Sequence, residues 1–420
     1  MQILWISYIS SWTPTLVDLI KRENRLAIIV PTGGKVVNYE QIDDVDYYYL
    51  HLHPQDTMKR MNRNNFEHYQ TIITKVNPDI IHVHGTELNF AQVQNYTSIP
   101  VVISIQGILQ ACKPFINNYL QEVTIRPFRT IKNRIGRGGY LVMNKKINKG
   151  VQEYEKEILQ KGKYFFCRTN WDKAQITFNN PQAQIFQGEE LLRPDFYQKA
   201  DSWKIHNCQR HSIFIPSGFN PIKGMYLAVK TLALLKNFYP HVSLNIPGIG
   251  ETEFYRQGIR DWLLGEEYIR YTRHLIFENK LKDNIHFLGK LNAEEMTIQM
   301  QKANIFLSPS SIDNSPNVVG EATMIGTPIV ATAVGGVLSM LKDEISCLFA
   351  PAGDEYTIAY QIKRLFDNDS LATKISQGAY QVALKRHNKQ ITIQQYLNAY
   401  QAIIEQEKTS AVSREFNEIW

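Results

Sequence analysis

The sequence NIFLSPSSIDNSPNVVGEATMIGTPIVATAVGG, residues 304–336, determines the fold class that we expect for this chain. It begins with Ile305–Leu307, an apolar run short enough to be a buried strand. Ser308–Ser315 follows and is rich in Ser, Pro, Asp and Asn, which are turn-forming residues. Pro316 is tolerated in the first turn of a helix, and Asn317–Ile325 can continue that helix.

The end of this stretch predicts a return to extended chain. Gly326 is suited to end the helix, and Ile329–Thr332 is typical of the next strand. Asp313 then lies in the loop, and Glu321 lies one to two turns inside the helix. N–H groups at a helix start lack intrahelical partners and carry about half a positive charge, which suits a phosphate. A helix start that suits a phosphate, next to carboxylates that can bind sugar hydroxyls, predicts a sugar-nucleotide site.

The same alternation of short apolar strands and helical stretches runs along the rest of the chain. These strands lack strict two-residue alternation, as strands buried on both faces do. The pattern predicts two doubly wound, parallel sheets. The expected strands are Ile3–Ile6, Ala27–Val30, Ile80–Val83, Val101–Ile105, Tyr164–Cys167, Gln184–Phe186, Ser212–Ile215, Val242–Ile246, Ile285–Leu288 and Cys347–Phe349.

A chain of 420 residues is too long for one ordinary domain. We predict an α/β fold of two facing Rossmann-like domains. Residues 1–187 form the first, and the strand-poor stretch 188–210 is a linker. Residues 211–390 form the second, and residues 391–420 form a C-terminal helix that can pack back on the first domain.

Composition excludes several classes of protein. The apolar and charged fractions are those of a soluble globular chain, and no apolar run approaches the roughly 18 residues of a membrane span. The N-terminus has no basic leader, so we expect no secretory signal. The four cysteines form no C-x-x-C pair, which argues against a metal site or a disulfide framework and for isolated thiols in a reducing cytoplasm.

The net charge of +6 is unevenly distributed. Residues 113–149 contain nine basic residues and one acid, with Phe115, Tyr119, Phe128 and Tyr140 between them. Nucleic acid, anionic lipid or a diphosphate substrate could each explain this stretch. Because no RNA-binding signature accompanies it, we expect no nucleic acid, and two interpretations stay open, a membrane-surface element and a solvated basic face.

Polar residues follow the strands of the first predicted sheet, where ligands of such sheets bind. His84, Gly85 and Glu87 form the most polar of these strand ends. Gln106-Gly107 and Arg168 follow two further strands. We interpret His84 as functional and His82, inside its strand, as structural.

Lys223 stands at the start of a predicted helix in the second domain. Lysine is out of place at a helix's positive end unless an anion binds there, so we expect Lys223 to contact a diphosphate. Gly224 lets the backbone approach the ligand closely. Gly335-Gly336 fits either a tight turn or a close approach to ligand.

The second half resembles glycosyltransferase family 4, retaining enzymes of the GT-B type, as found in bacterial polysaccharide synthesis. An acid, seven residues and Glu are followed by Ala-x-x-x-Gly-Thr-Pro, and the family's Lys-Gly and paired glycines are also present. These residues are Asp313, Glu321, Ala322, Gly326, Thr327, Pro328, Lys223, Gly224, Gly335 and Gly336. The first half resembles the family more loosely, through His82-Val83-His84-Gly85 and Gln106-Gly107.

Three positions depart from the family pattern. Asp313 stands where the first acid is usually Glu, Gly218 where an Arg is usual, and Gln106 where a histidine is frequent. The missing Arg removes one cation from the diphosphate, and Arg168 or Arg193 could replace it.

The resemblance implies a role for each matched residue. Lys223 would hold the diphosphate, Glu321 the ribose and Asp313 the hydroxyls of the transferred sugar, and with His84 these are the predicted catalytic residues. The rest of the donor pocket would be Gly218, Gly224, Asn314, Ser315, Pro316 and Asn317. The acceptor side would be Glu87, Gln106, Gly107 and Arg168.

The resemblance also implies an activity, a metal-independent transfer of a sugar from a nucleoside diphosphate to a hydroxyl of a glycan or lipid-linked acceptor. No metal or resident cofactor is expected. The first domain would serve the acceptor and the second the donor, in the cytoplasm or at the inner membrane face. A GT-B-type sugar-nucleotide epimerase and a catalytically lapsed nucleotide-sugar-binding protein remain alternatives.

Overall fold

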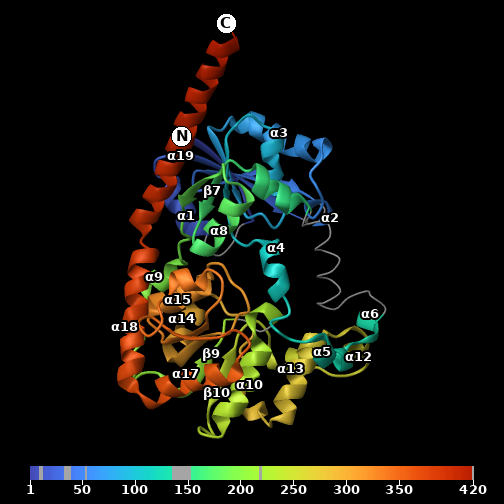
Figure 1. The fold of residues 1–420 in the computed structure, drawn as a ribbon, viewed down its shortest axis with the longest axis vertical. Helices are drawn as coiled ribbons and strands as arrows, with labels where there is room; N and C mark the ends of the chain where they lie inside the picture. The colour runs from blue at the N-terminus through green and yellow to red at the C-terminus, as the bar shows by residue number, and fades with distance from the viewer. Residues whose placement is uncertain (9–12, 33–38, 53, 135–152, 217–219, 419–420) are drawn as a thin grey trace. The chain divides into compact units, whose positions relative to one another are not determined.

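A computed structural model describes residues 1–8, 13–32, 39–52, 54–134, 153–216 and 220–418 (Figure 1). The chain divides into two compact units, and the sequence crosses between them more than once. Unit 1 comprises Met1–Ala111, Ile147–Leu191 and His387–Trp420. Unit 2 comprises Cys112–Lys146 and Leu192–Arg386. Residues 112–146, which lie in the sequence range predicted for the first domain, are therefore part of unit 2.

Unit 1 is built on a sheet with the strand order β3-β4-β2-β1-β5-β6-β7-β8. Its strands are β1 (Gln2–Ile6), β2 (Arg25–Thr32), β3 (Tyr39–Ile42), β4 (Val45–His51), β5 (Ile80–His84), β6 (Val101–Ser104), β7 (Tyr164–Cys167) and β8 (Gln184–Gln187). Its helices are α1 (Thr13–Ile20), α2 (Pro54–Thr57), α3 (Arg63–Val76), η1 (Asn89–Asn95), α4 (Leu109–Cys112), α8 (Asn170–Asn179) and α19 (Lys389–Glu418), with a further helical stretch at residues 153–161.

The strands of unit 1 are buried on both faces. In β1, Ile3 and Trp5 belong to one hydrophobic cluster, and Leu4 and Ile6 belong to another. The first cluster includes α1 and α19, and the second includes α3. This double burial explains why the strands read as continuous apolar runs.

Unit 2 is built on a parallel sheet with the order β11-β10-β9-β12-β13-β14. Its strands are β9 (Gln209–Phe214), β10 (Ser243–Ile246), β11 (Ile285–Phe287), β12 (Ala303–Ser308), β13 (Ile329–Thr332) and β14 (Leu348–Ala350). Its longer helices are α10 (Met225–Lys236), α13 (Glu267–Glu278), α14 (Ala293–Lys302), α15 (Asn317–Ile325), α17 (Glu355–Asp367) and α18 (Asp369–Arg386). Its shorter ones are η2 (Lys113–Phe115), α5 (Glu122–Ile125), η3 (Arg126–Phe128), α6 (Ile131–Arg134), α9 (Pro194–Gln198), η4 (Pro221–Lys223), α11 (Glu251–Phe254), α12 (Ile259–Leu264), η5 (Lys282–Asn284) and α16 (Val337–Met340).

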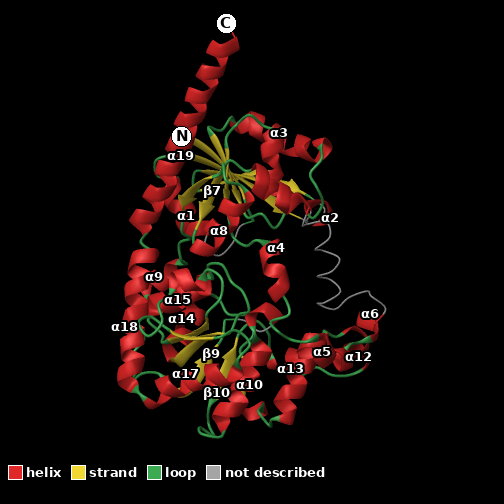
Figure 2. Ribbon diagram, viewed as in Figure 1, coloured by secondary structure: helices red, strands yellow, loops and turns green. Residues whose placement is uncertain are grey.

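Figure 2 shows each sheet flanked by helices, and the predicted α/β class with two Rossmann-like domains is confirmed. The 304–336 stretch folds as predicted, with α15 spanning Asn317–Ile325 and Gly326 in the left-handed region that ends it. One part of the first sheet differs from the prediction, because β3 pairs antiparallel with β4. Asp43 and Asp44 join these strands with φ of 49° and 64°, which suits a two-residue hairpin turn.

Candidate functional site

Two loops of unit 2 meet at the carboxyl ends of β9 and β12. The first contains η4 and Gly224, which has a φ of 75° and immediately precedes α10. A Cβ at Gly224 would lie 2.2 Å from Pro309 O in the second loop, so no other residue fits without displacing backbone. Ser311 N donates to Ile222 O at 2.9 Å and ties the loops together. Gly224 thus serves a close approach of backbone to backbone within the protein.

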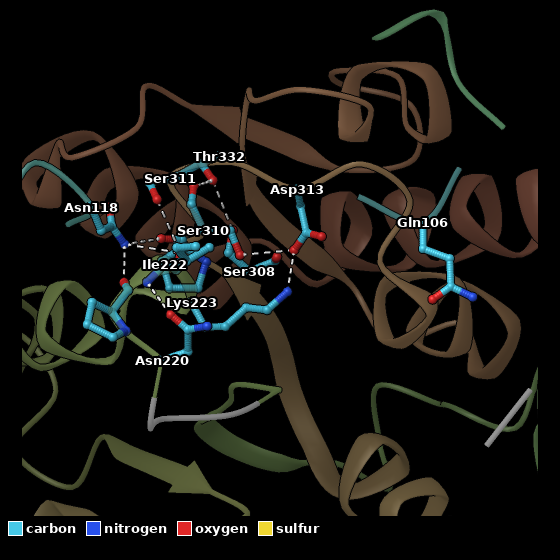
Figure 3. Close-up of polar contacts among 12 residues, drawn as sticks. Gln106, Asn118, Asn220, Ile222, Lys223, Ser308, Ser310, Ser311, Asp313 and Thr332 are labelled. Atoms are coloured by element: carbon cyan, nitrogen blue, oxygen red, sulfur yellow. Dashed lines mark hydrogen bonds and ion pairs between the residues drawn. The ribbon is translucent and has the colours of Figure 1, made fainter. Parts of the chain in front are cut away.

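Lys223 and Asp313, each from one of these loops, form an ion pair (Figure 3). Lys223 Nζ lies 2.6 Å from Asp313 Oδ2, and Ser310 Oγ lies 3.4 Å from the same oxygen. The two side chains retain 29% and 16% of their exposure, so the pair is accessible to a ligand from solvent. The predicted diphosphate cation and the predicted sugar-binding acid therefore lie side by side.

The loop that carries Asp313 is held by contacts with β13 and the residues after it. Thr332 Oγ1 donates to Ser310 O at 2.5 Å (Figure 3). A Cβ at Gly335 would lie 2.3 Å from Asp313 O, and Gly336 N donates to that oxygen at 2.9 Å. The paired glycines thus pack directly against the backbone carbonyl of Asp313.

Glu321 lies in the second turn of α15 and is 4% exposed. Arg193 approaches it with both arms of its guanidinium, Nε at 2.7 Å from Oε1 and Nη2 at 2.9 Å from Oε2. Burial raises the pKa of Glu321, and the Arg193 hydrogen bonds and charge oppose that rise. Arg193, considered from sequence as a diphosphate ligand, is thus engaged with the predicted ribose-binding acid. It also stacks over the Phe196 ring, with 4.8 Å between Cζ and the centroid.

The start of α15 is bordered by buried polar residues. Asn314 is 5% exposed and Ser315 is 8% exposed. Ser315 Oγ accepts a hydrogen bond from Arg386 Nη2 at 3.1 Å, and Pro316 is the N-terminal cap residue. Asn317 then begins the nine-residue helix, so the predicted donor residues 314–317 are contiguous with Asp313 and Glu321.

Asn118, which sequence reasoning missed, joins the two loops of unit 2. It is 0% exposed, and its Nδ2 lies 3.0 Å from Pro221 O, 3.4 Å from Ile222 O and 3.2 Å from Pro309 O (Figure 3). Tyr226 Oη donates to Asn118 O. Asn118 and Tyr119 both have positive φ, 48° and 62°. The only local signal was the Asn-Asn-Tyr turn composition, because every partner of the side-chain amide lies about a hundred residues or more away in sequence.

The two histidines at the end of β5 in unit 1 are buried. His82 lies between Tyr400 Oη at 2.6 Å and Ser104 Oγ at 2.7 Å, which fits the structural interpretation. The His84 ring packs 4.7 Å from Trp5 and 4.0 Å from His82, centroid to centroid. Burial, reinforced by the nearby charge of Arg168, lowers the pKa of His84 to about 3. His84 is therefore a neutral imidazole near neutral pH.

The carboxylate of Glu87 lies against the loops that follow β5 and β6, which contain Gly85 and Gly107. A Cβ at Gly85 would lie 2.4 Å from Glu87 Oε2, and one at Gly107 would lie 3.0 Å from Glu87 Oε1. Burial raises the pKa of Glu87, and backbone N–H groups, including that of Gly107, oppose the rise. Gly85 has a φ of 95°, a backbone conformation that favours glycine.

Arg168 is 6% exposed and engaged within unit 1. Its Nη1 lies 2.8 Å from Glu190 Oε1, and its Nη2 donates to Gln106 O at 2.8 Å. The strands β5, β6 and β7 are neighbours in the first sheet, so the residues at and after their carboxyl ends lie together. These residues are His84, Glu87, Gln106, Gly107 and Arg168.

Glu155 is a second residue that sequence reasoning missed. It lies in the helical stretch 153–161 and is 0% exposed. Its carboxylate accepts from Leu109 N at 2.8 Å, Gln110 N at 2.9 Å and Thr86 Oγ1 at 3.3 Å. Burial, partly offset by those backbone N–H groups, raises the pKa of Glu155 to about 7. Glu155 thus joins the loop after β5 to the loop after β6.

Some predicted residues lie outside the described part of the chain. Gly218 is one, and within the basic stretch so are Arg137, Lys145, Lys146 and Lys149. Among the described residues, no group of three or more His, Cys, Asp or Glu side chains is placed to hold a metal ion.

Comparison with known proteins supports a glycosyltransferase assignment for the second half of the chain. Residues 204–382 match the family model described as glycosyl transferases group 1. A D-inositol 3-phosphate glycosyltransferase of Salinispora arenicola is 29% identical over 97 residues, 23% of this chain and 22% of that protein. A phosphatidyl-myo-inositol mannosyltransferase of Mycobacterium leprae is 25% identical over 193 residues, 46% of each. The aligned regions thus span less than half of these curated relatives.

Solved structures are similar over nearly the whole chain. Sucrose-phosphate synthase from Thermosynechococcus elongatus superposes with a TM-score of 0.68 at 15% identity, covering 96% of this chain and 99% of that one. Anabaena HepE in complex with UDP superposes with a TM-score of 0.62 at 13% identity, covering 96% and 100%. At such low identity these likenesses establish the fold.

Proposed function

We propose that the chain is a retaining glycosyltransferase, on the premise that residues 204–382 match the family model of glycosyl transferases group 1. It would move a sugar from a nucleoside diphosphate to a hydroxyl of a glycan or lipid-linked acceptor. We place this reaction in the assembly of cell-surface polysaccharide.

One observation carries the proposal, the pairing of Lys223 Nζ with Asp313 Oδ2 at 2.6 Å beside the start of α10. A diphosphate here would meet the ammonium group and the positive end of the α10 dipole. A cation about 4 Å from a phosphate charge contributes roughly 4 kcal/mol at an intermediate dielectric, before desolvation. The same ammonium, moving between Asp313 and the phosphate, would keep the donor sugar and its leaving group together.

The neighbouring residues would hold the rest of the donor. Glu321, oriented by Arg193, would accept hydrogen bonds from ribose hydroxyls. Asp313 and the backbone N–H groups of residues 314–317 would hold the transferred sugar. On the acceptor side, Glu87 would accept from the attacking hydroxyl's neighbours, and neutral His84 would act as a hydrogen-bonding group without charge. Gln106, Gly107 and Arg168 would shape that side.

In the proposed step, the bond between the anomeric carbon and the diphosphate oxygen breaks as the acceptor oxygen bonds to the same face of that carbon. The acceptor's proton passes to the departing phosphate oxygen. The two electrons of the broken bond leave with the diphosphate, whose charge Lys223 and the helix starts stabilise. No carboxylate nucleophile is required, and the anomeric configuration is retained.

The test is incubation of the purified chain with a panel of UDP-, GDP-, ADP- and dTDP-sugars, with and without short glycan acceptors. Transfer, or slow hydrolysis that releases the α-configured sugar from an α-linked donor, supports the proposal. A changed sugar on an intact nucleotide would instead identify an epimerase. Binding without turnover of any donor would identify a lapsed enzyme.

We also propose a cytoplasmic location with peripheral attachment to the inner membrane face. No helix among the described residues combines the length and the hydropathy that a bilayer-spanning segment needs. The support for attachment is the basic character of residues 113–149, of which 113–134 are described. A lipid-linked acceptor would be met at that surface.

A further inference from the structure

Exposed apolar side chains gather on three short helices of unit 2 that are far apart in sequence. Val123 on α5 is 71% exposed and Ile131 on α6 is 38% exposed. On α12, Ile259 is 77% exposed and Trp262 is 56% exposed. The three helices have only 4, 4 and 6 residues, so large apolar groups form an unusual share of them. We name the exposed side of these helices the α5–α6–α12 surface.

The helices are held together by contacts across the sequence gap. Thr130 Oγ1 lies 3.3 Å from Gly265 O, at the junction of α6 and α12. The Phe128 ring, just before α6, packs edge-on against Tyr271 at 5.3 Å. Figure 1 shows α5, α6 and α12 side by side, next to α13. The apolar groups therefore belong to one part of unit 2.

Four acids on or next to these helices are already paired with cations. These acids pair with four cations at 3.0–3.6 Å, which leaves no net charge among them: Glu122 and Glu267 with Arg129, Glu266 with Lys132, and Asp261 with Arg270 and Arg273. Arg126 and Arg134 are exposed and, among the described residues, have no acid within ion-pair distance. The surface thus combines apolar side chains with two uncompensated guanidinium groups.

This combination fits an anionic lipid surface. Trp and Ile side chains on short helices suit the boundary between headgroups and acyl chains, where an indole keeps its N–H in the polar layer. Arginines beside them suit lipid phosphates, which form paired hydrogen bonds with guanidinium.

We propose that the α5–α6–α12 surface docks the enzyme on anionic membranes, with Trp262 and Ile259 entering the headgroup boundary and Arg126 and Arg134 contacting lipid phosphates. The inference deepens the proposed function, because it gives the lipid-linked acceptor a surface at which it is presented. It also adds α12, which lies outside the basic stretch and is brought to it only by folding.

The experiment is co-sedimentation of the full chain with two kinds of vesicle, at 50 and 500 mM salt. One kind is pure phosphatidylcholine, and the other contains equal amounts of phosphatidylcholine and phosphatidylglycerol. We expect binding to the anionic vesicles that weakens at high salt. Arg126→Gln with Arg134→Gln should lower the partition coefficient about 30-fold, the effect of two lipid contacts. Ile259→Ser with Trp262→Ser should lower it at both salt concentrations, because the apolar contribution is not screened.

A matched control replaces an exposed aromatic elsewhere. Phe178 on α8 of unit 1 is 88% exposed, and Phe178→Ser should leave vesicle binding unchanged. Circular dichroism and gel filtration check that each variant folds and keeps the oligomeric state of the wild type. Subtracting the emission spectrum of Trp262→Phe from that of the wild type isolates the emission of Trp262. This emission should shift to shorter wavelength when the chain binds vesicles.

The proposal is overturned if the wild type ignores anionic vesicles, or if the Ile259/Trp262 variant binds them as well as the wild type does. A change of oligomeric state in that variant would also overturn it, by identifying the surface as a contact between copies. Because vesicle binding needs no donor, it tests the surface separately from the donor panel. Failure of every donor with intact vesicle binding would reject the proposed function alone.

Discussion

Both units hold their functional loops together with one buried side chain from a distant segment, but the two side chains differ in chemistry. In unit 2, the neutral amide of Asn118 donates to carbonyls of the loops that carry Gly224 and Asp313. In unit 1, the carboxyl group of Glu155 accepts from the loops that carry Thr86 and Leu109. An amide keeps its hydrogen bonds at any physiological pH, whereas a carboxyl group whose pKa is raised to about 7 changes its charge near neutrality. The side chain that holds the loops together should therefore make that hold depend on pH in unit 1 and not in unit 2.

The largest effect expected is that of Lys223→Ala, which tests whether unit 2 supplies the charge for the leaving group. We expect kcat to fall about 100- to 1,000-fold, the usual result of removing one preorganised stabiliser of developing charge. Steady-state kinetics with the donor found in the panel measures it. Lys230→Ala is the matched control, because Lys230 lies on the same α10 and pairs with Glu355 at 3.0 Å. Unchanged turnover in Lys223→Ala would reject the assignment of the leaving-group site to unit 2.

Asn118→Gly should give the next largest effect, on stability. Glycine accepts the φ of 48° without strain, so the substitution isolates the side chain. The amide loses three hydrogen bonds, each worth about 1 kcal/mol, and Pro309 O loses its donor while Pro221 O and Ile222 O keep Gly224 N and Ser311 N, so we expect a loss of about 3 kcal/mol. Thermal unfolding measures it.

Tyr119→Gly is the control for Asn118→Gly, because Tyr119 has a φ of 62° but a side chain that is 55% exposed. Its unfolding temperature should stay near that of the wild type. If the two glycine variants unfold alike, the amide of Asn118 does not brace the loops.

Glu155→Gln sharpens the comparison through its pH dependence. The folded pKa is about 7 and the unfolded one is about 4.5, so the folded chain keeps a proton that the unfolded chain releases. Stability contributed by this group is complete below pH 4.5 and is lost as pH rises towards 7, by about 3 kcal/mol. Glutamine does not titrate, so the variant should lack this slope between pH 5 and 8 in unfolding temperature.

The control for Glu155→Gln lies on the same helical stretch. Burial raises the pKa of Glu157, but its contacts with Lys161 and Arg60 outweigh burial and lower it. Glu157→Gln should therefore keep the falling slope of the wild type. Equal slopes for the wild type and Glu155→Gln would show that the loops of unit 1 are held without this carboxyl group's titration.

The same comparison explains what the sequence could predict. The segment 304–336 contains its own signals, the strand, the turn formers and the glycine stop, and α15 was predicted to the residue. The β3–β4 hairpin was missed because its four-residue edge strand, Tyr39–Ile42, is wholly exposed and contains no apolar run. Asn118 and Glu155 were missed because an isolated polar residue gives no local signal when the partners of its side chain lie 45 to 191 residues away. The contacts of such residues form only in the folded chain and cannot be predicted from the local sequence.

Arg193→Lys should have the smallest effect and compares two buried acids directly. Glu321 has a two-armed cationic partner, whereas the partners of Glu155 are neutral donors. Lysine keeps the charge but loses the fork, so its single contact should cost about 1 kcal/mol and lower affinity for UDP or GDP a few-fold. Glu321 would then be less well stabilised as an anion, its pKa would rise further, and the loss should be larger at pH 6 than at pH 8. Calorimetric titration at both values measures this, with Arg210→Lys, which loses a half-exposed pair with Asp369, as control. A loss independent of pH would mean that Arg193 does not keep Glu321 ionised. The cationic partner of Glu321 would then make no difference between this acid and Glu155, whose partners are neutral.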